Sequence, residues 1–168
     1  GTPDWTGAEV VIRKERWIWQ IGRITSQSGG KISYVDDGLF TPRDHWGFFI
    51  QDDVRTLDQP NEWYFNAATK KISVYSANQP VNVKVASAEV LISSSGKNYV
   101  VFSGLSLLGA NTSAVQIVGG SYVKVANSVI NHSGLEGVNF SWCSHCTVDG
   151  NVITNSNYAA VYGPTNNT

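Results

Sequence analysis

Three stretches of the sequence decide its fold: NYVVFSGLSLLGAN (98–111), SYVKVANSVINHSG (121–134) and SHCTVDGNVITNSN (144–157). Each begins 23 residues after the one before, and the three align without a gap. Apolar residues fall in common columns: Phe102, Val125 and Val148 in one, and Leu107, Ile130 and Ile153 in another. A fixed period of this kind indicates stacked supersecondary units, each burying its apolar face against its neighbours.

Each unit consists of short β runs separated by Gly or Asn. Two or three short strands in about 23 residues, at about 3.3 Å per residue, describe one coil of a parallel β-helix. Gly104, Asn127 and Gly150 share a column, and these residue types accept left-handed backbone angles, so we expect a tight corner there. The alternative is a β-sandwich whose strands happen to be evenly spaced.

The N-terminal half has a different pattern. Alternating segments at 9–13, 17–24, 31–35, 48–51, 62–66 and 71–76 are bounded by turn sequences such as SQSGGK and NAATKK. This pattern predicts antiparallel strands that close into a small barrel or sandwich. The sequence therefore predicts an all-β chain, with an antiparallel barrel or sandwich over residues 1–79 and parallel β-helix coils over residues 80–168.

The stretch LDQPNEWYFNAATKKISVYS (57–76) allows two interpretations. Carboxylates beside aromatic rings are typical of a glycan site. However, Trp63, Phe65, Ile72 and Val74 alternate as they would on one face of a hairpin. Asp58, just before Pro60, is of the type that accepts backbone N–H bonds in a turn. We therefore interpret the stretch as a structural hairpin.

The order of these segments carries a family resemblance. WTGAEVVI (5–12), GFFIQDD (47–53) and LDQPNEWYFN (57–66), followed by β-helix coils, resemble secreted right-handed parallel β-helix proteins of the pectate-lyase-like superfamily. More specifically, they resemble β-helix glycoside hydrolases with an inserted β-barrel or sandwich, although Asn61 stands where Gly is usual. The resemblance implies a secreted or cell-surface protein that acts on a polysaccharide or oligosaccharide. It also implies catalytic carboxylates on later coils.

Composition excludes several other classes. Only 15% of the residues are charged, against roughly 25% in typical soluble domains, and the net charge is −1. The absence of a basic block argues against nucleic-acid binding, and no apolar run approaches the roughly 18 residues that span a membrane. The chain contains no Met and stops after a strand-like run, so we expect it to be a piece of a longer protein.

The candidate ligand site lies on one face of the predicted helix. Val115 and Val138 form an inward column, which makes Gln116, Asn139 and Tyr162 outward-facing. We predict that Glu136, Asn139 and Tyr162 line a groove for a glycan, although a solvated polar face would have the same pattern. A glycosidase needs two carboxylates about 5–10 Å apart. We expect Glu136 and Asp149 to lie on different sides of a coil, so the catalytic residues are not assigned.

The sequence CSHC (143–146) with His132 allows a zinc site, a local disulfide, or one buried and one turn thiol. Cys146 falls in the inward column and Cys143 at the turn, which favours unpaired thiols. The Asp pairs at 36–37 and 52–53 suggest calcium, but solvated loops explain them as well. We therefore predict no metal and no cofactor.

The sequence leaves two functions open. The chain is either part of a glycoside-hydrolase-like protein whose catalytic residues lie largely outside it, or a non-catalytic carbohydrate-binding or cell-surface module. In either case we expect the 168 residues alone to be inactive as an enzyme. Because the last coil has an open edge, we also expect self-association through the C-terminal coil.

Overall fold

The structure, a computed structural model, describes residues 3–163. It divides into two compact units between Asn82 and Val83, whereas the sequence pattern predicts the boundary between residues 79 and 80. Apart from one turn of 3-10 helix, η1 (Val54–Thr56), the regular structure in the described residues is β-strand. The predicted all-β class, with an antiparallel sheet followed by parallel coils, is confirmed.

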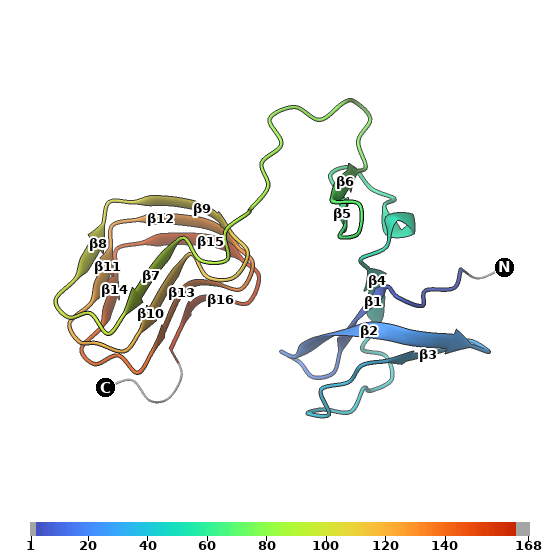
Figure 1. Ribbon diagram of the computed structural model, residues 1–168. Coiled ribbons are helices and arrows are strands. Elements are labelled where there is room, and N and C mark those ends of the chain that lie inside the picture. The colour runs from blue at the N-terminus through green and yellow to red at the C-terminus, as the bar shows by residue number, and fades with distance from the viewer. Residues whose placement is uncertain (1–2, 164–168) are drawn as a thin grey trace. The chain divides into compact units, whose positions relative to one another are not determined.

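The first unit contains a four-stranded antiparallel sheet with the strand order β3-β2-β1-β4 (Figure 1). Its strands are β1 (Glu9–Arg13), β2 (Trp19–Ser28), β3 (Lys31–Tyr34) and β4 (Phe48–Gln51). Gly29 and Gly30 join β2 to β3 with φ angles of 57° and 78°, as a two-residue type I′ hairpin turn requires. Since β3 and β4 are the two edges, the expected barrel or sandwich takes the form of an open sheet.

One face of this sheet forms a small core. Ala8, Val10 and Ile24 are buried on that face, and Ile12 and Ile50 pack against them. Side chains alternate between the two faces of a strand. The opposite face therefore carries the residues that lie between these core positions.

A separate hairpin consists of β5 (Trp63–Asn66) and β6 (Lys71–Val74). Trp63 pairs with Val74 and Phe65 with Ile72, so these four side chains share one face, as predicted. That face is largely solvent-exposed, however, with Trp63 67% and Phe65 40% exposed. The two strands pair as predicted, but the apolar face of the hairpin is not buried as the sequence pattern predicts.

The turn before β5 is fixed by a different acid from the one predicted. The Glu62 carboxylate accepts hydrogen bonds from the backbone N–H groups of Asp58 and Gln59, at 2.7 and 2.9 Å. Asn61 has a φ of 75°, a left-handed angle that Asn tolerates better than most residues. Asn61 can therefore occupy this turn position in place of Gly.

The second unit is a parallel β-helix whose strands stack in three sheets, β7-β10-β13-β16, β8-β11-β14 and β9-β12-β15 (Figure 1). The first sheet comprises β7 (Ile92–Ser95), β10 (Val115–Val118), β13 (Glu136–Ser141) and β16 (Ala159–Tyr162). The second comprises β8 (Val101–Ser103), β11 (Lys124–Ala126) and β14 (Thr147–Asp149). The third comprises β9 (Ser106–Ala110), β12 (Val129–Ser133) and β15 (Val152–Ser156).

The register between coils follows the 23-residue repeat. Val115 pairs with Val138, and Val125 with Val148. Ile130, which the repeat places in an inward column, has no exposed surface. The apolar columns therefore form the core of the helix, which confirms the predicted architecture.

Left-handed backbone angles mark the corners of each coil. The predicted corner column has φ angles of 68° at Gly104, 49° at Asn127 and 63° at Gly150. Three further columns of positive φ follow the same period: 96/119/142, 99/122/145 and 109/132/155. Each coil therefore has four fixed left-handed positions, three between its strands and one within β9, β12 or β15. The sequence pattern predicts one of the four.

Candidate functional site

Ser93, Gln116, Asn139 and Tyr162 form one column across the sheet β7-β10-β13-β16. Each pairs with the next, and neighbouring strands lie about 4.8 Å apart. Val138, which precedes Asn139 on β13, has no exposed surface, so the column faces outward. The structure therefore brings Asn139 and Tyr162 together as the sequence predicts.

The column ends in an aromatic pair on the last coil. The ring centroids of Tyr158 and Tyr162 lie 5.7 Å apart at an interplanar angle of 65°. Both rings are accessible, with Tyr158 66% and Tyr162 37% exposed. Amide and hydroxyl groups beside accessible rings can hydrogen-bond and stack on a polar ring-shaped ligand.

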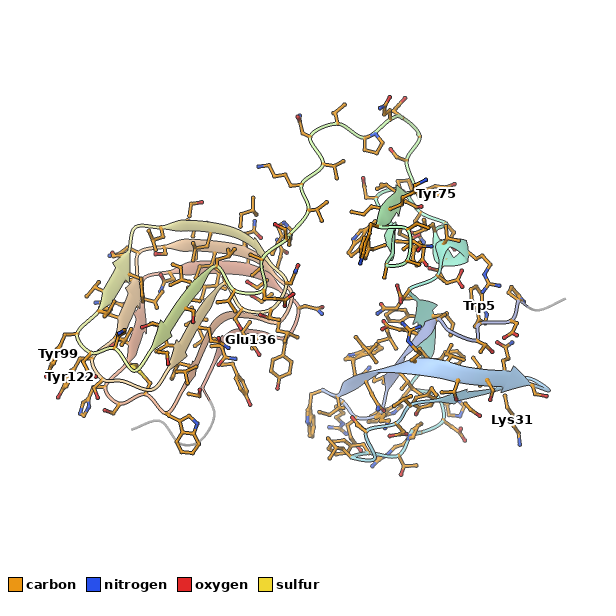
Figure 2. The ribbon with its side chains drawn as sticks, viewed as in Figure 1. Trp5, Lys31, Tyr75, Tyr99, Tyr122 and Glu136 are labelled. Atoms are coloured by element: carbon orange, nitrogen blue, oxygen red, sulfur yellow. A yellow bond between two sulfur atoms is a disulfide. The ribbon has the colours of Figure 1, made fainter. Side chains whose placement is uncertain are left out.

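Glu136 is not accessible from this face. It is only 6% exposed, and its carboxylate Oε2 accepts a hydrogen bond of 2.7 Å from Ser113 Oγ. Figure 2 shows Glu136 on the sheet that contains β13. Alternation does not assign Glu136 to a face, because the adjacent residues Ala114 and Val115 both lie in the core where the strands of this sheet begin. Its burial therefore separates Glu136 from Asn139 and Tyr162, with which the sequence predicts that it lines an open groove.

The other carboxylate of the later coils does not complete a pair with Glu136. Asp149 lies on β14, in a different sheet from β13. Its side chain is 64% exposed, and Lys124 Nζ lies 3.2 Å from its Oδ2. One of the two acids is buried and bonded to Ser113, while the other is solvated and ion-paired, so their environments differ as well as their sheets.

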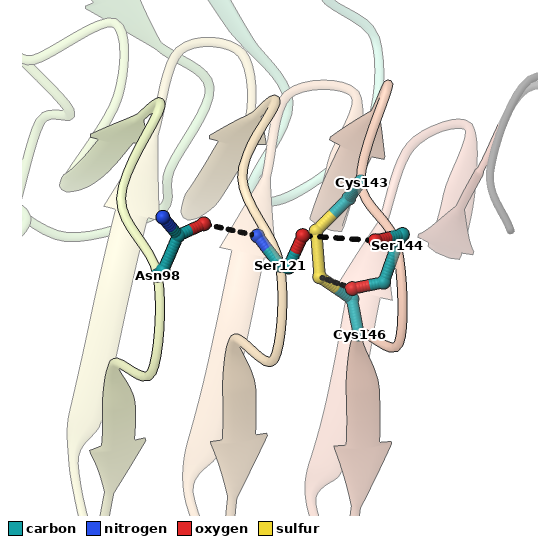
Figure 3. The surroundings of a disulfide bond; sticks show 5 residues. All are labelled: Asn98, Ser121, Cys143, Ser144 and Cys146. Atoms are coloured by element: carbon teal, nitrogen blue, oxygen red, sulfur yellow. Dashed lines mark hydrogen bonds between the residues drawn. A yellow bond between two sulfur atoms is a disulfide. The ribbon is translucent and has the colours of Figure 1, made fainter.

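Cys143 and Cys146 form a disulfide at the corner that leads into β14 (Figure 3). Cys143 is 1% exposed and belongs to the core of the helix. The interpretation of these residues as unpaired thiols, with Cys143 at an incidental turn position, is therefore wrong. Within residues 3–163 no three His, Cys, Asp or Glu side chains converge in a way that could hold a metal ion.

Polar side chains join successive coils beside this disulfide. The backbone N–H of Ser121 donates to Asn98 Oδ1 at 2.8 Å, and the hydroxyls of Ser121 and Ser144 lie 2.9 Å apart. These residues stand 23 positions apart, so each bond links one coil to the next (Figure 3). The disulfide therefore joins two residues within one corner, and the hydrogen bonds join the corners of neighbouring coils.

An aromatic ladder runs along the neighbouring column. Tyr99 stacks on Tyr122 with centroids 4.9 Å apart, and Tyr122 stacks on His145 at 4.7 Å. Figure 2 shows Tyr99 and Tyr122 side by side at one corner of the helix. The 23-residue repeat aligns these three residues in a column, but it does not predict that their rings stack outside the core. Because the rings cover one another's faces, the ladder primarily stabilises the coils.

The Asp pairs of the N-terminal unit bind cationic side chains. Lys14 is fully buried, and its Nζ lies 2.6 Å from Asp36 and 3.1 Å from Asp37. Asp53 makes an ion pair of 2.6 Å with Arg55. These contacts account for Asp36, Asp37 and Asp53 without a metal ion.

The Lys14 contact changes the ionisation of both partners. The hydrogen bond from Lys14, aided by the backbone N–H of Gly38, lowers the pKa of Asp36 from 3.8 to about 2. Burial lowers the pKa of Lys14, but the bonds to Asp36 and Asp37 outweigh burial, and its pKa is raised. Both groups therefore remain charged at neutral pH.

The outward face of the N-terminal sheet carries exposed aromatic residues that the sequence pattern does not single out as a site. Trp19 and Phe49 lie with ring centroids 6.3 Å apart. Arg13 lies near the rings of both Trp19 and Trp46. The tryptophans are visible in the sequence, but their exposure depends on which face of the sheet forms the core.

Comparisons with known proteins identify no relative: no family model matches the chain, and no match was found among curated proteins or solved structures. Within the described part of the chain, no helix has the length and apolar character needed to cross a bilayer. The function therefore has to be inferred from the surfaces of the two units.

Proposed function

We propose that this chain supplies a carbohydrate-contacting surface to a secreted or cell-surface protein that acts on a polysaccharide. The observation that carries the proposal is the outward column of Ser93, Gln116, Asn139 and Tyr162, which stand in register on four successive strands. A glycan lying across the strands would meet hydrogen-bonding groups about every 4.8 Å and an accessible ring at the end of the column.

We further propose that the parent is glycoside-hydrolase-like and that its acid–base pair does not come from these residues. General acid–base cleavage of a glycosidic bond needs two carboxyl groups that flank it. Glu136 is buried against Ser113, and Asp149 lies in another sheet. A non-catalytic carbohydrate-binding or structural module is the second candidate, because the same surface would serve it without a pair of carboxylates.

The disulfide supports the extracellular part of the proposal. Disulfides form and persist in secreted and cell-surface proteins and are rare where thiols are kept reduced. Cys143 and Cys146 are paired here. The pairing therefore favours a secreted or cell-surface location.

The test is a glycan-binding screen of the purified chain and its Tyr162→Ala variant by calorimetry. Loss of an accessible ring should weaken binding about tenfold. Tyr99→Ala is the matched control, because Tyr99 is an exposed tyrosine of the same helix outside the column. Equal binding by the wild type and Tyr162→Ala would refute the proposed surface. Hydrolysis by the isolated chain that Glu136→Gln abolishes would refute the assignment of catalysis to other residues.

A further inference from the structure

The sheet β15-β12-β9 of the β-helix ends in an open strand edge. Its outermost strand is β9, and the outer edge of β9 faces no other strand of the described residues (Figure 1). Leu107 on β9 packs against the core but is only partly buried. A strand edge with apolar residues behind it pairs with another strand or aggregates unless it is covered. The edge of β9 is therefore a surface at which a further strand can bind.

The chain just before the β-helix has the sequence pattern of a strand. Residues 81–86 read VNVKVA, in which Val81, Val83 and Val85 recur at every second position. Alternating β-branched residues are typical of a strand in a sheet. In the structure Val83 and Val85 lie outside any sheet and are 57% and 61% exposed. A strand-forming segment and an open strand edge thus belong to the same unit.

The residues that follow this segment already lie on the first coil in the 23-residue register. The backbone N–H of Asn111 donates to the carbonyl of Ala88 at 2.8 Å. Ala86 lies against Gly109, with its Cβ 3.6 Å from the position that a Cβ on Gly109 would take. Both pairs stand 23 positions apart, which is the separation of paired residues throughout the β-helix. The register is therefore set at residue 86, and it places the three preceding residues along β9.

Continuing this register puts two exposed valines beside two outward positions of β9. Val83 falls opposite Ser106, and Val85 falls opposite Leu108. Leu108 is itself half exposed, so its contact with Val85 would remove apolar surface of both residues from water. Side chains opposite one another on adjacent strands are the contacts that stabilise a sheet.

Lys84, between the two valines, falls in the inward column of Leu107, Ile130 and Ile153. At the end of the helix its methylene chain can cover Leu107 while the ammonium group remains in water. Inward-pointing charged residues, and lysines on edge strands, are means by which natural sheets prevent a further strand from adding. The segment therefore has the pattern of a terminal strand rather than that of an inner coil.

We propose that residues 83–87 dock on β9 as the fourth strand of its sheet and cap the N-terminal end of the β-helix. Docking extends the contact that already exists at Ala86 and leaves residues 75–82 as the connection from β6. The occupant of the β9 edge is thus a segment of this chain itself. The inference concerns the end of the helix and does not depend on the proposed glycan surface.

The first experiment traps the docked strand with a disulfide. In Val85→Cys/Leu108→Cys the two Cα atoms would lie about 4.8 Å apart, a distance that a disulfide spans. Val83→Cys/Leu108→Cys is the matched control, because a shift of two residues puts the Cα atoms about 8 Å apart. Both variants keep Cys143 and Cys146. Peptide mass mapping after oxidation in a glutathione buffer identifies which cysteines are joined.

We expect the in-register pair to form about tenfold more cross-linked monomer than the control pair. Hydrogen exchange on the wild-type chain is the second measurement and needs no substitution. Alternate amides within residues 83–87 should exchange about tenfold more slowly than those of residues 77–81. Equal cross-linking of the two pairs, or equal exchange of the two segments, would overturn the proposal. So would cross-linked dimers in place of monomers, because the edge of β9 would then bind a second copy.

Discussion

Both units of this chain bury Val and Ile side chains, but they differ in how they cover their apolar surfaces. In the β-helix, the partner of each strand residue stands 23 positions away, and Val115, Ile130 and Val138 have no exposed surface. In the N-terminal sheet, β1 pairs with β4 across about 40 residues of chain, and Trp19, Ile21 and Phe49 on the face opposite the core are about half exposed. A repeated unit buries its apolar residues against copies of itself, whereas a single open sheet leaves one face for another partner.

The largest expected effect is the loss of stability when a core side chain of either unit is truncated. Ile130→Ala and Ile24→Ala should each cost about 2–5 kcal/mol, because both remove a side chain that is at most 1% exposed. Urea unfolding followed by tryptophan fluorescence reports mainly on the first unit, which holds five of the six tryptophans. Circular dichroism reports on both units.

If the units unfold independently, Ile130→Ala should shift the circular dichroism transition and leave most of the fluorescence transition unchanged. Ile24→Ala should shift the fluorescence transition. Equal shifts of both signals by either variant would show that the units unfold together and would remove the contrast between their cores.

The second effect concerns the disulfide of the helix. Cys143 and Cys146 close a loop of about four residues, for which the chain-entropy relation gives about 2 kcal/mol. Reduction should therefore lower the urea midpoint of the second unit. The Cys143→Ala/Cys146→Ala double variant is the control and should not respond to reductant. A wild-type midpoint that is unchanged by complete reduction would contradict this prediction.

The third prediction concerns the pH dependence that the Lys14–Asp36 ion pair gives to the first unit. Because the folded pKa of Asp36 is lowered from 3.8 to about 2, its ionised form stabilises the first unit above about pH 4. That contribution is lost as the pH falls through about 2. Lys14→Met should make the pH dependence of fluorescence-detected stability shallower in this range. Lys31→Met, which removes an exposed lysine of the same sheet, should leave the dependence as it is, and an identical change in both variants would disprove the assignment to Lys14.

The smallest effect on stability tests the open end of the helix. Val161 is 41% exposed, whereas Val115 and Val138 in the same column are fully buried. We propose that the C-terminal coil self-associates through this edge. Val161→Lys should abolish association in sedimentation velocity and change the unfolding free energy by less than about 0.5 kcal/mol. Val118→Lys, at an exposed position of an inner coil, is the control, and a monomeric wild type at high concentration would refute the proposal.

The fold is predictable where the same environment recurs. The columns through Val125, Ile130 and Asn127 are visible in the sequence because three coils impose the same burial or backbone angle at each position. The burial of Glu136 could not be predicted, because it depends on the contact with Ser113 of the preceding coil.

Other features could not be predicted because they depend on distances that a single sequence does not contain. The pairing of Cys143 with Cys146 depends on how tightly the corner folds. The contact of Lys14 with Asp36 and Asp37 joins positions more than 20 residues apart without a repeat to reveal it. The exposure of Trp19 could not be predicted without knowing which side of the sheet Val10 and Ile24 bury.

The corner columns give the helix a natural unit of length. Because the four left-handed positions recur every 23 residues, one complete coil is interchangeable in length with any other. Inserting a copy of residues 115–137 would extend the helix by one strand spacing, about 4.8 Å, and keep every later residue in its column. Inserting a single residue inside a coil would displace the later corners of that coil from their columns. The molecule should therefore tolerate growth in whole coils far better than the smallest change in length.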